Sequence, residues 1–301
     1  MTNKDLISQY VDTGMGIPRY QYDKLSSNDK RTYLRKIEMS IELAPKNIEH
    51  YYGVLPEEKQ LALINKGAFW IRYMNNPTEK AQLAAVNRAA DIIIYIDNPT
   101  ENVQLAAINK DENMVRLIKN PTEKVQLTAV MLDAHFLGNI IKNGIVNPSE
   151  EVQLAAVKTN GYAIRYIQNP SEEVQLAAVK TNGKAIQYIQ NPSESVQLSG
   201  VKQNGTSITY IIKNGINPSE AVQLAAVKQD GTSITYIIKN GVNPSEAVQL
   251  AAVNEIFLAI RHIQNPSDAV QFMAVKQDVD AIRYINNPSD RVKELQKQLY
   301  G

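Results

Sequence analysis

The stretch "NPSEEVQLAAVKTNGYAIRYIQ", residues 147–168, is followed at once by "NPSEEVQLAAVKTNGKAIQYIQ", residues 169–190. The two copies of 22 residues differ at two positions. A short period repeated along a chain is typical of an array in which each unit contacts its neighbours and is stabilised by them. We therefore expect stacked units rather than one globular core.

Asn-Pro pairs mark where each unit begins. They start at Asn76, Asn98, Asn120, Asn147, Asn169, Asn191, Asn217, Asn243, Asn265 and Asn287. Most units have 22 residues, and three have 26 or 27 and carry "IIKNG" before the next Asn-Pro: 120–146, 191–216 and 217–242. They are preceded by a degenerate unit at residues 54–75, and we interpret residues 31–52 as a second degenerate unit.

The fold class predicted from this pattern is all-α: a solenoid of about ten or eleven tandem two-helix repeats with terminal caps. We expect an N-terminal capping region at 1–53, tandem repeats at 54–286 and a C-terminal capping helix at 287–301. Tyr33 and other aromatic side chains near the N-terminus are suited to covering the first open end of the stack.

Within one unit the residues predict two helices. Asn147 is a good N-cap, Pro148 suits the first helical position, and Glu150 then falls where it closes a capping box. The first helix runs through "SEEVQLAAVKT" and ends at Gly161, the usual residue after a helix C-terminus. "YAIRYIQ" forms a short second helix. Helices of this length are marginal alone, so stacking must stabilise them.

One glutamine lies within the apolar arc of the first helix. It recurs as Gln82, Gln104, Gln126, Gln153, Gln175, Gln197, Gln223, Gln249 and Gln271. A buried amide without partners costs about 1–3 kcal/mol. We therefore expect a ladder of glutamine side chains bonded to neighbouring units or to their turns, in preference to a binding role.

The second helix carries an aromatic row and a variable position. Tyr166 is predicted to lie on a flank that meets the next unit, and inter-unit packing is preferred over base stacking for this row. The position of Arg165 varies between units and faces solvent on a helical wheel, as does that of Glu151. Arg261 and Arg283 stand at the same exposed position as Arg165, so a partner can be recognised there.

The pattern "EVQLAAVKTNG" resembles short helical-hairpin solenoids, namely HEAT-like and leucine-rich-repeat-variant arrays. "VKQNG" at 201–205 and "VKQDG" at 227–231 are most similar to an "AAVKQNG" repeat family without an assigned function. This resemblance covers roughly 54–301 and implies architecture rather than activity. A segment at 12–36 is similar to part of tailed-phage proteins of unknown function.

Little in the chain points to catalysis. There is no cysteine, and the three histidines, His50, His135 and His262, lie in distant units. The recurring acids at the position of Glu150 are explained by capping, and "DTGMGIP" lacks the lysine of a phosphate-binding loop. We predict no enzymatic activity, no metal and no cofactor.

A lysine strip offers an alternative. Lys158, Lys180, Lys202, Lys228 and Lys276 end the first helices of their units on one exposed side. HEAT-like DNA-repair glycosylases use a basic groove, so nucleic-acid binding is the second hypothesis. Lysine near a helix C-terminus also complements the helix dipole, and 32 basic residues balance 31 acidic ones.

Two units replace the Asn/Asp-Gly turn with large side chains. These are Leu132, His135 and Phe136 in unit 120–146, and Ile256, Phe257 and Leu258 in unit 243–264. Such groups are either buried locally or presented as interface anchors. With the exposed arginines they are our candidates for a protein-binding site.

We therefore expect a non-enzymatic protein-binding scaffold or inhibitor. The phage resemblance implies a protein of the host cytoplasm that acts on a host or defence factor. No run of apolar residues is long enough to suggest a membrane span, so a cytoplasmic location is expected.

Overall fold

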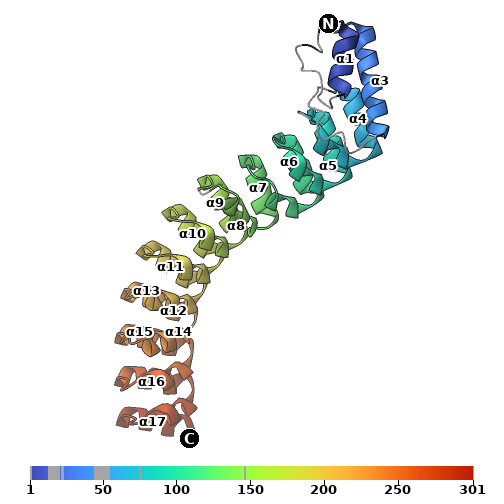
Figure 1. Ribbon diagram of the computed structural model, residues 1–301. Helices are drawn as coiled ribbons and strands as arrows, with labels where there is room; N and C mark the ends of the chain where they lie inside the picture. The colour runs from blue at the N-terminus through green and yellow to red at the C-terminus, as the bar shows by residue number, and fades with distance from the viewer. Residues whose placement is uncertain are drawn as a thin grey trace. The chain divides into compact units, whose positions relative to one another are not determined.

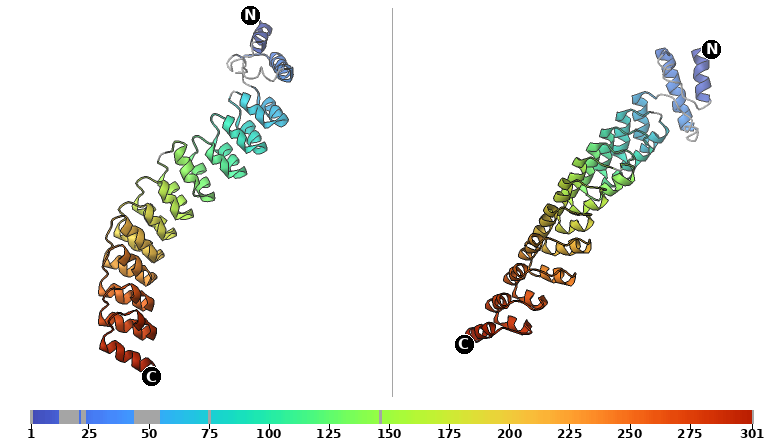
Figure 2. Two further views of the ribbon diagram at one scale, coloured as in Figure 1. Left: turned by 60° about the horizontal axis from the view of Figure 1, so that its bottom comes forward. Right: turned by 90° about the vertical axis from the view of Figure 1, so that its left-hand side faces the viewer.

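The computed structural model describes residues 2–12, 21, 24–43, 55–74, 76–145 and 147–300 (Figures 1 and 2). The chain divides into two compact units, Met1–Ala129 and Val130–Gly301, each of which is described by itself. All regular structure in the described residues is helical. The predicted all-α class is confirmed. Tyr20, Tyr22, His50 and the segment 13–18 lie outside the described residues.

The first compact unit begins with two helices and continues with repeats. Its elements are α1 (Asn3–Asp12), α3 (Ser27–Leu43), α4 (Glu57–Lys66), η2 (Ala68–Tyr73), α5 (Glu79–Arg88), η3 (Ala90–Tyr95), α6 (Glu101–Lys110) and η4 (Glu112–Arg116). α1 packs on α3, and Tyr33 is fully buried. α3 has 17 residues, whereas each first helix of a repeat has 10.

The boundary between the compact units falls inside α7 (Glu123–Leu132), and the second unit consists of repeats. Its elements are α8 (Phe136–Lys142), α9 (Glu150–Thr159), η5 (Gly161–Tyr166), α10 (Glu172–Thr181), η6 (Gly183–Tyr188), α11 (Glu194–Gln203), η7 (Gly205–Ser207), α12 (Ile208–Lys213), α13 (Glu220–Gln229), α14 (Ser233–Lys239), α15 (Glu246–Glu255), η8 (Phe257–His262), α16 (Asp268–Gln277), η9 (Val279–Tyr284) and α17 (Asp290–Tyr300).

Each repeat contributes to two layers. In the second compact unit the first helices, from α9 to α16, pack side by side in sequence order, and the second helices form a parallel row against them (Figures 1 and 2). We call these rows the first-helix layer and the second-helix layer. α17 packs on α16 and η9, in the place of one further first helix. Neighbour-to-neighbour stacking of this kind is that of a solenoid.

The first helices begin two residues later than expected. Ser149, not Asn147, is the N-cap, and its Oγ accepts the amide of Val152 at 3.4 Å. Glu150 is therefore the first helical residue and closes no capping box, so this prediction was wrong. The reason lies in Pro148, whose carbonyl oxygen is held outside the helix by a side chain of the same unit.

That side chain is the recurring glutamine. Nε2 of Gln153 donates to the carbonyl oxygen of Pro148 at 2.8 Å, and the same bond is made in every unit from 76 to 286. Some of these amides also reach the next unit: Oε1 of Gln271 accepts the amide of Ser289 at 3.0 Å. The predicted structural ladder is confirmed.

A second ladder joins the helix starts. The hydroxyl of Ser171 donates to the carboxylate of Glu150 in the preceding unit at 2.5 Å, and the pattern repeats along the second compact unit. Hydroxyls of Ser193 and Ser195 lower the pKa of Glu172 below its usual value. The recurring acids therefore bond neighbouring units instead of capping their own helices.

Glycine after the first helix has a different role from the one predicted. The helix α10 ends at Asn182, whose backbone is extended, and not in a left-handed turn. A Cβ atom on Gly183 would collide with the carbonyl oxygen of Gly200 in the next first helix. Gly161 likewise follows an extended residue, Asn160, and lies against the carbonyl oxygen of Ala178, so the prediction that it caps the first helix was wrong.

Candidate functional site

The tyrosine row of the second-helix layer is partly exposed. In the second compact unit Tyr188 is 42% exposed and Tyr236 is 38% exposed. The ring of Tyr188 meets that of Tyr162 edge to face with centroids 6.0 Å apart. Tyr166 packs against Gly138, where a Cβ atom would lie 2.8 Å from the ring. Inter-unit packing is confirmed, and in both of these cases the ring contacts the preceding unit.

Arginines accompany these rings. The guanidinium of Arg165 lies 4.7 Å from the ring centroid of Tyr166 and donates to its hydroxyl at 2.6 Å. The guanidinium carbon of Arg261 lies 4.9 Å from the ring centroid of Tyr284 in the next unit. Both arginines are exposed, as predicted. Stacking fixes the plane of a guanidinium and leaves N–H donors available to a partner.

Arg283 differs from the other two arginines. It is exposed, but its guanidinium is paired with Asp280 at 3.1 Å. Asp280 also accepts the hydroxyl of Tyr300, at the same distance of 3.1 Å. The C-terminal end of the row is therefore neutralised within the chain.

The turn side chains of unit 120–146 separate into two groups. Phe136 is only 2% exposed and belongs to the core, so its selection as an interface anchor was wrong. It replaces the small Ala163 or Ser207 of other units, and the fold accommodates it by burial. Leu132 is 51% exposed and adjoins Met131 at 68%, a neighbour that we had not selected.

The other turn candidates differ in exposure. His135 is exposed, and its Nδ1 lies 2.8 Å from Oδ1 of Asp133. Ile256 points at the backbone of Gly231 in the preceding unit, with Cγ2 2.5 Å from the place of a Cβ atom there. Phe257 and Leu258 are half-buried. The two turns thus present no matched pair of aromatic anchors.

The lysine strip lies in the first-helix layer. Its five members are all exposed, and among the described residues none has an ion-pair partner. The strip is interrupted because Asn254 occupies the equivalent position in α15. Lys202 and Lys228 line an open groove between α11 and α13 together with Leu198 and Leu224.

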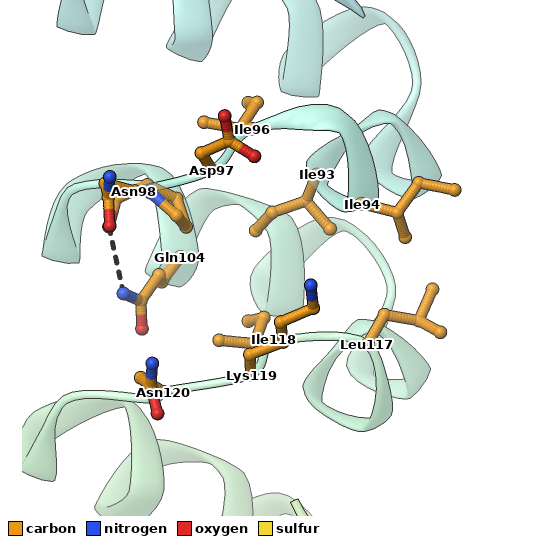
Figure 3. Close-up of a pocket in the computed structure, with 11 residues that line it drawn as sticks. Ile93, Ile94, Ile96, Asp97, Asn98, Gln104, Leu117, Ile118, Lys119 and Asn120 are labelled. Carbon is orange, nitrogen blue, oxygen red and sulfur yellow. Dashed lines mark hydrogen bonds between the residues drawn. The ribbon is translucent and has the colours of Figure 1, made fainter.

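A small cavity lies in the first compact unit between the repeats 76–97 and 98–119. It measures about 200 Å³. Ile94 and Leu117 lie at one end, and Asn98, Gln104 and Asn120 at the other (Figure 3). Small-molecule sites usually enclose about 300–1,000 Å³. Nε2 of Gln104 donates to the carbonyl oxygen of Pro99, and its Oε1 accepts the amide of Thr122. Because this side chain is already hydrogen-bonded within the chain, we interpret the cavity as a packing defect between turns.

A group of cations converges on one histidine of the second-helix layer. The ring of His262 is exposed but partly desolvated by its neighbours, which lowers its pKa, and the charges of Lys239 and Arg261 lower it further. Lys239 ends α14 in the preceding unit, so charges from two repeats act on one ring. This cationic neighbourhood was not predicted, because it depends on contact between α14 and η8.

Two features of other protein classes, a metal-ligand cluster and a membrane-spanning helix, are absent from the described residues. In the part of the chain that the structure describes, no three histidine, aspartate or glutamate side chains gather as metal ligands would. None of the helices described here combines the length and apolar character needed to cross a bilayer.

Comparison with family models, with curated proteins and with solved structures gave no match. The resemblances to the "AAVKQNG" repeats and to phage proteins therefore remain predictions. The class that the fold itself defines is an α-solenoid of two-helix repeats.

Proposed function

We propose that this protein is a non-enzymatic binding scaffold or inhibitor whose second-helix layer holds a protein partner. The observation that carries the proposal is the row of tyrosines in this layer, of which Tyr188, Tyr236 and Tyr284 are exposed and Tyr166 and Tyr284 carry a stacked arginine. Tyrosine and arginine are the residues that dominate the binding energy of protein interfaces.

The architecture supports the same conclusion. Two ladders of hydrogen bonds, from Gln153 and Glu150 and their equivalents, fix each unit to its own turn or to its neighbour. The exposed second-helix side chains take no part in those ladders, so they can vary without loss of the stack. A rigid scaffold with a variable surface binds with little ordering cost.

Nucleic-acid binding by the lysine strip is the alternative. It is favoured by the exposure of Lys158, Lys180, Lys202, Lys228 and Lys276, none of which is ion-paired within the part of the chain that the structure describes. The break at Asn254 and the position of these lysines at helix C-termini, where they complement the dipole, support the scaffold instead.

The test is affinity capture with the full chain and two variants. One variant carries Tyr188→Ser and Tyr236→Ser, and the other carries Lys158→Gln, Lys180→Gln and Lys228→Gln. We expect a protein to be retained by the wild type and the lysine variant and lost by the tyrosine variant, with unchanged circular dichroism. Capture that depends on the lysines and is abolished by nuclease treatment would establish the alternative.

A further inference from the structure

The second-helix layer of the second compact unit is basic along most of its length. From η5 to η8 it consists of residues 161–168, 183–190, 205–216, 231–242 and 257–264, and we call this the basic face. It contains five cations: Arg165, Lys184, Lys213, Lys239 and Arg261. It contains no aspartate or glutamate.

The acids of these same repeats lie elsewhere. Those of the first helices stand mainly at the helix starts, where Glu172 and its equivalents bind serine hydroxyls of the next unit. Asp230 precedes α14, and its Oδ1 accepts both the amide and the hydroxyl of Thr232. Among the described residues no carboxylate forms an ion pair with any cation of the basic face. The face therefore carries uncompensated positive charge.

The lengthened units add to this charge. Each "IIKNG" segment extends the second helix and ends it with a lysine, as Lys213 ends α12 and Lys239 ends α14. Both lysines are exposed, and α12 packs beside α14. His262 lies at this end of the face, and its pKa is lowered by desolvation and, to a smaller extent, by the charges of Lys239 and Arg261 from adjacent repeats.

We infer that the basic face is the docking surface for an acidic protein segment, with carboxylates bound by its lysines and arginines and apolar side chains lying on its tyrosine rings. This inference rests on the proposed function and names the chemistry of the partner. Charge complementarity between an interface and its partner accelerates association and excludes wrong partners. The exposed rings of Tyr188 and Tyr236 supply the apolar contact.

The spacing of charge favours protein over nucleic acid. Adjacent helices pack about 8–10 Å apart, so one cation per repeat amounts to roughly one charge per 10 Å. Each strand of DNA carries a phosphate about every 3.4 Å of helix axis. The basic face would leave most phosphates unpaired, whereas acidic residues spaced along a protein segment match its density.

The experiment uses a fluorescent copolymer of glutamate and tyrosine as probe, with the full-length chain. The test variant carries Lys213→Gln, Lys239→Gln and Arg261→Gln. The control variant removes the same charge from the first-helix layer with Lys180→Gln, Lys202→Gln and Lys228→Gln. We expect the test variant to weaken binding by about tenfold or more and the control to weaken it far less.

A second readout follows His262 by NMR. Carboxylates bound beside Lys239 and Arg261 favour the protonated ring, so the copolymer should raise the depressed pKa of His262. A copolymer of lysine and tyrosine, which carries the opposite charge, should neither bind nor shift it. Equal losses in the two triple variants, or an unchanged pKa of His262 in the bound state, would overturn the inference.

An oligothymidylate is measured in parallel at about 50 and 200 mM salt. Tighter binding of this nucleic acid than of the acidic copolymer, lost in the test variant, would also overturn the inference. The proposed function can survive that result. If a captured protein is lost with the Tyr188→Ser and Tyr236→Ser variant but kept by the test variant, the scaffold stands and the acidic segment is rejected.

Discussion

The 22-residue unit 169–190 and the 26-residue unit 217–242 build the same first helix and different second helices. α10 and α13 each have 10 residues, a serine N-cap and a glutamine bonded to the proline carbonyl at 2.9 or 3.0 Å. The four extra residues all follow the first helix. They convert a 3₁₀ turn, η6, into an α-helix, α14.

The backbone at the C-terminal end of the two units differs as well. The shorter unit is followed by Asn191, which adopts a left-handed backbone with φ of 50° before Pro192. In the longer unit α14 ends at Lys239 and is followed by Gly241, with φ of 84°, and the amide of Val242 donates to the carbonyl oxygen of Ile237 as in a Schellman motif. Asparagine and glycine are the residues that tolerate this conformation best.

From this difference we infer that the first-helix layer sets the register of the stack, whereas the second-helix layer can change in length. Both hydrogen-bond ladders belong to the first-helix layer and its turns, and the close backbone contact joins the start of a second helix, at Gly183, to the next first helix. The second-helix layer carries the exposed tyrosines and cations. A variable layer on a constant one is the arrangement expected of a binding surface.

The largest effect is predicted for Gly183→Ala in the shorter unit. The added Cβ would collide with the carbonyl oxygen of Gly200, so the start of η6 and the next first helix, α11, must separate. We expect the free energy of unfolding to fall by about 3 kcal/mol, at the upper end of overpacking costs. Gly241→Ala is the matched control, because a Cβ there meets no atom within 4 Å.

For Gly241→Ala only the left-handed backbone is unfavourable, which costs about 1–2 kcal/mol. Urea denaturation of both variants measures the difference. If Gly241→Ala lowered the free energy of unfolding as much as Gly183→Ala or more, the view that close contact with the next first helix stabilises the stack would be contradicted.

An intermediate effect is predicted for the glutamine ladder. Gln271→Leu removes bonds to Pro266 and to Ser289 of the next unit. Gln223→Leu removes the bond to Pro218, but its Oε1 has no partner in the structure. Both side chains are 8% exposed, so burial is matched.

We therefore expect Gln271→Leu to cost more than Gln223→Leu, within a range of about 1–3 kcal/mol. Thermal or urea unfolding of the two variants side by side gives the comparison. Equal costs would show that the contact with the next unit adds nothing to the bond with the proline carbonyl.

The smallest effect is predicted for a change in unit length. Replacing 231–242 by the sequence of 183–190 turns the longer unit into a shorter one. The first-helix layer is unchanged, so we expect cooperative unfolding and a melting temperature within about 4 °C of the wild type. Asn243 would then adopt the left-handed backbone that Asn191 has after the shorter unit.

The matched control inserts four residues inside α13, which displaces its ladder bonds and should abolish cooperative unfolding. Circular dichroism during heating distinguishes the two variants. Loss of cooperativity in the shortened unit, with the insertion tolerated, would reverse the roles that we assign to the two layers.

The period of the chain determined the fold class, because the same 22 residues must form the same helices wherever they recur. The helical wheel also identified Arg165 and Arg261 as exposed and the glutamines as structural. Such predictions need only the position of a residue within its own helix.

Contacts between units decided the rest. Whether Gly183 serves a turn or a close approach depends on where the Gly200 carbonyl lies. Whether Phe136 is an anchor or a core residue depends on the space between repeats, which periodicity does not specify. The convergence of Lys239 and Arg261 on His262 likewise joins two units. Sequence alone determined what each unit forms, and tertiary packing decided which side chains remain for a partner, because exposure is a property of the stack.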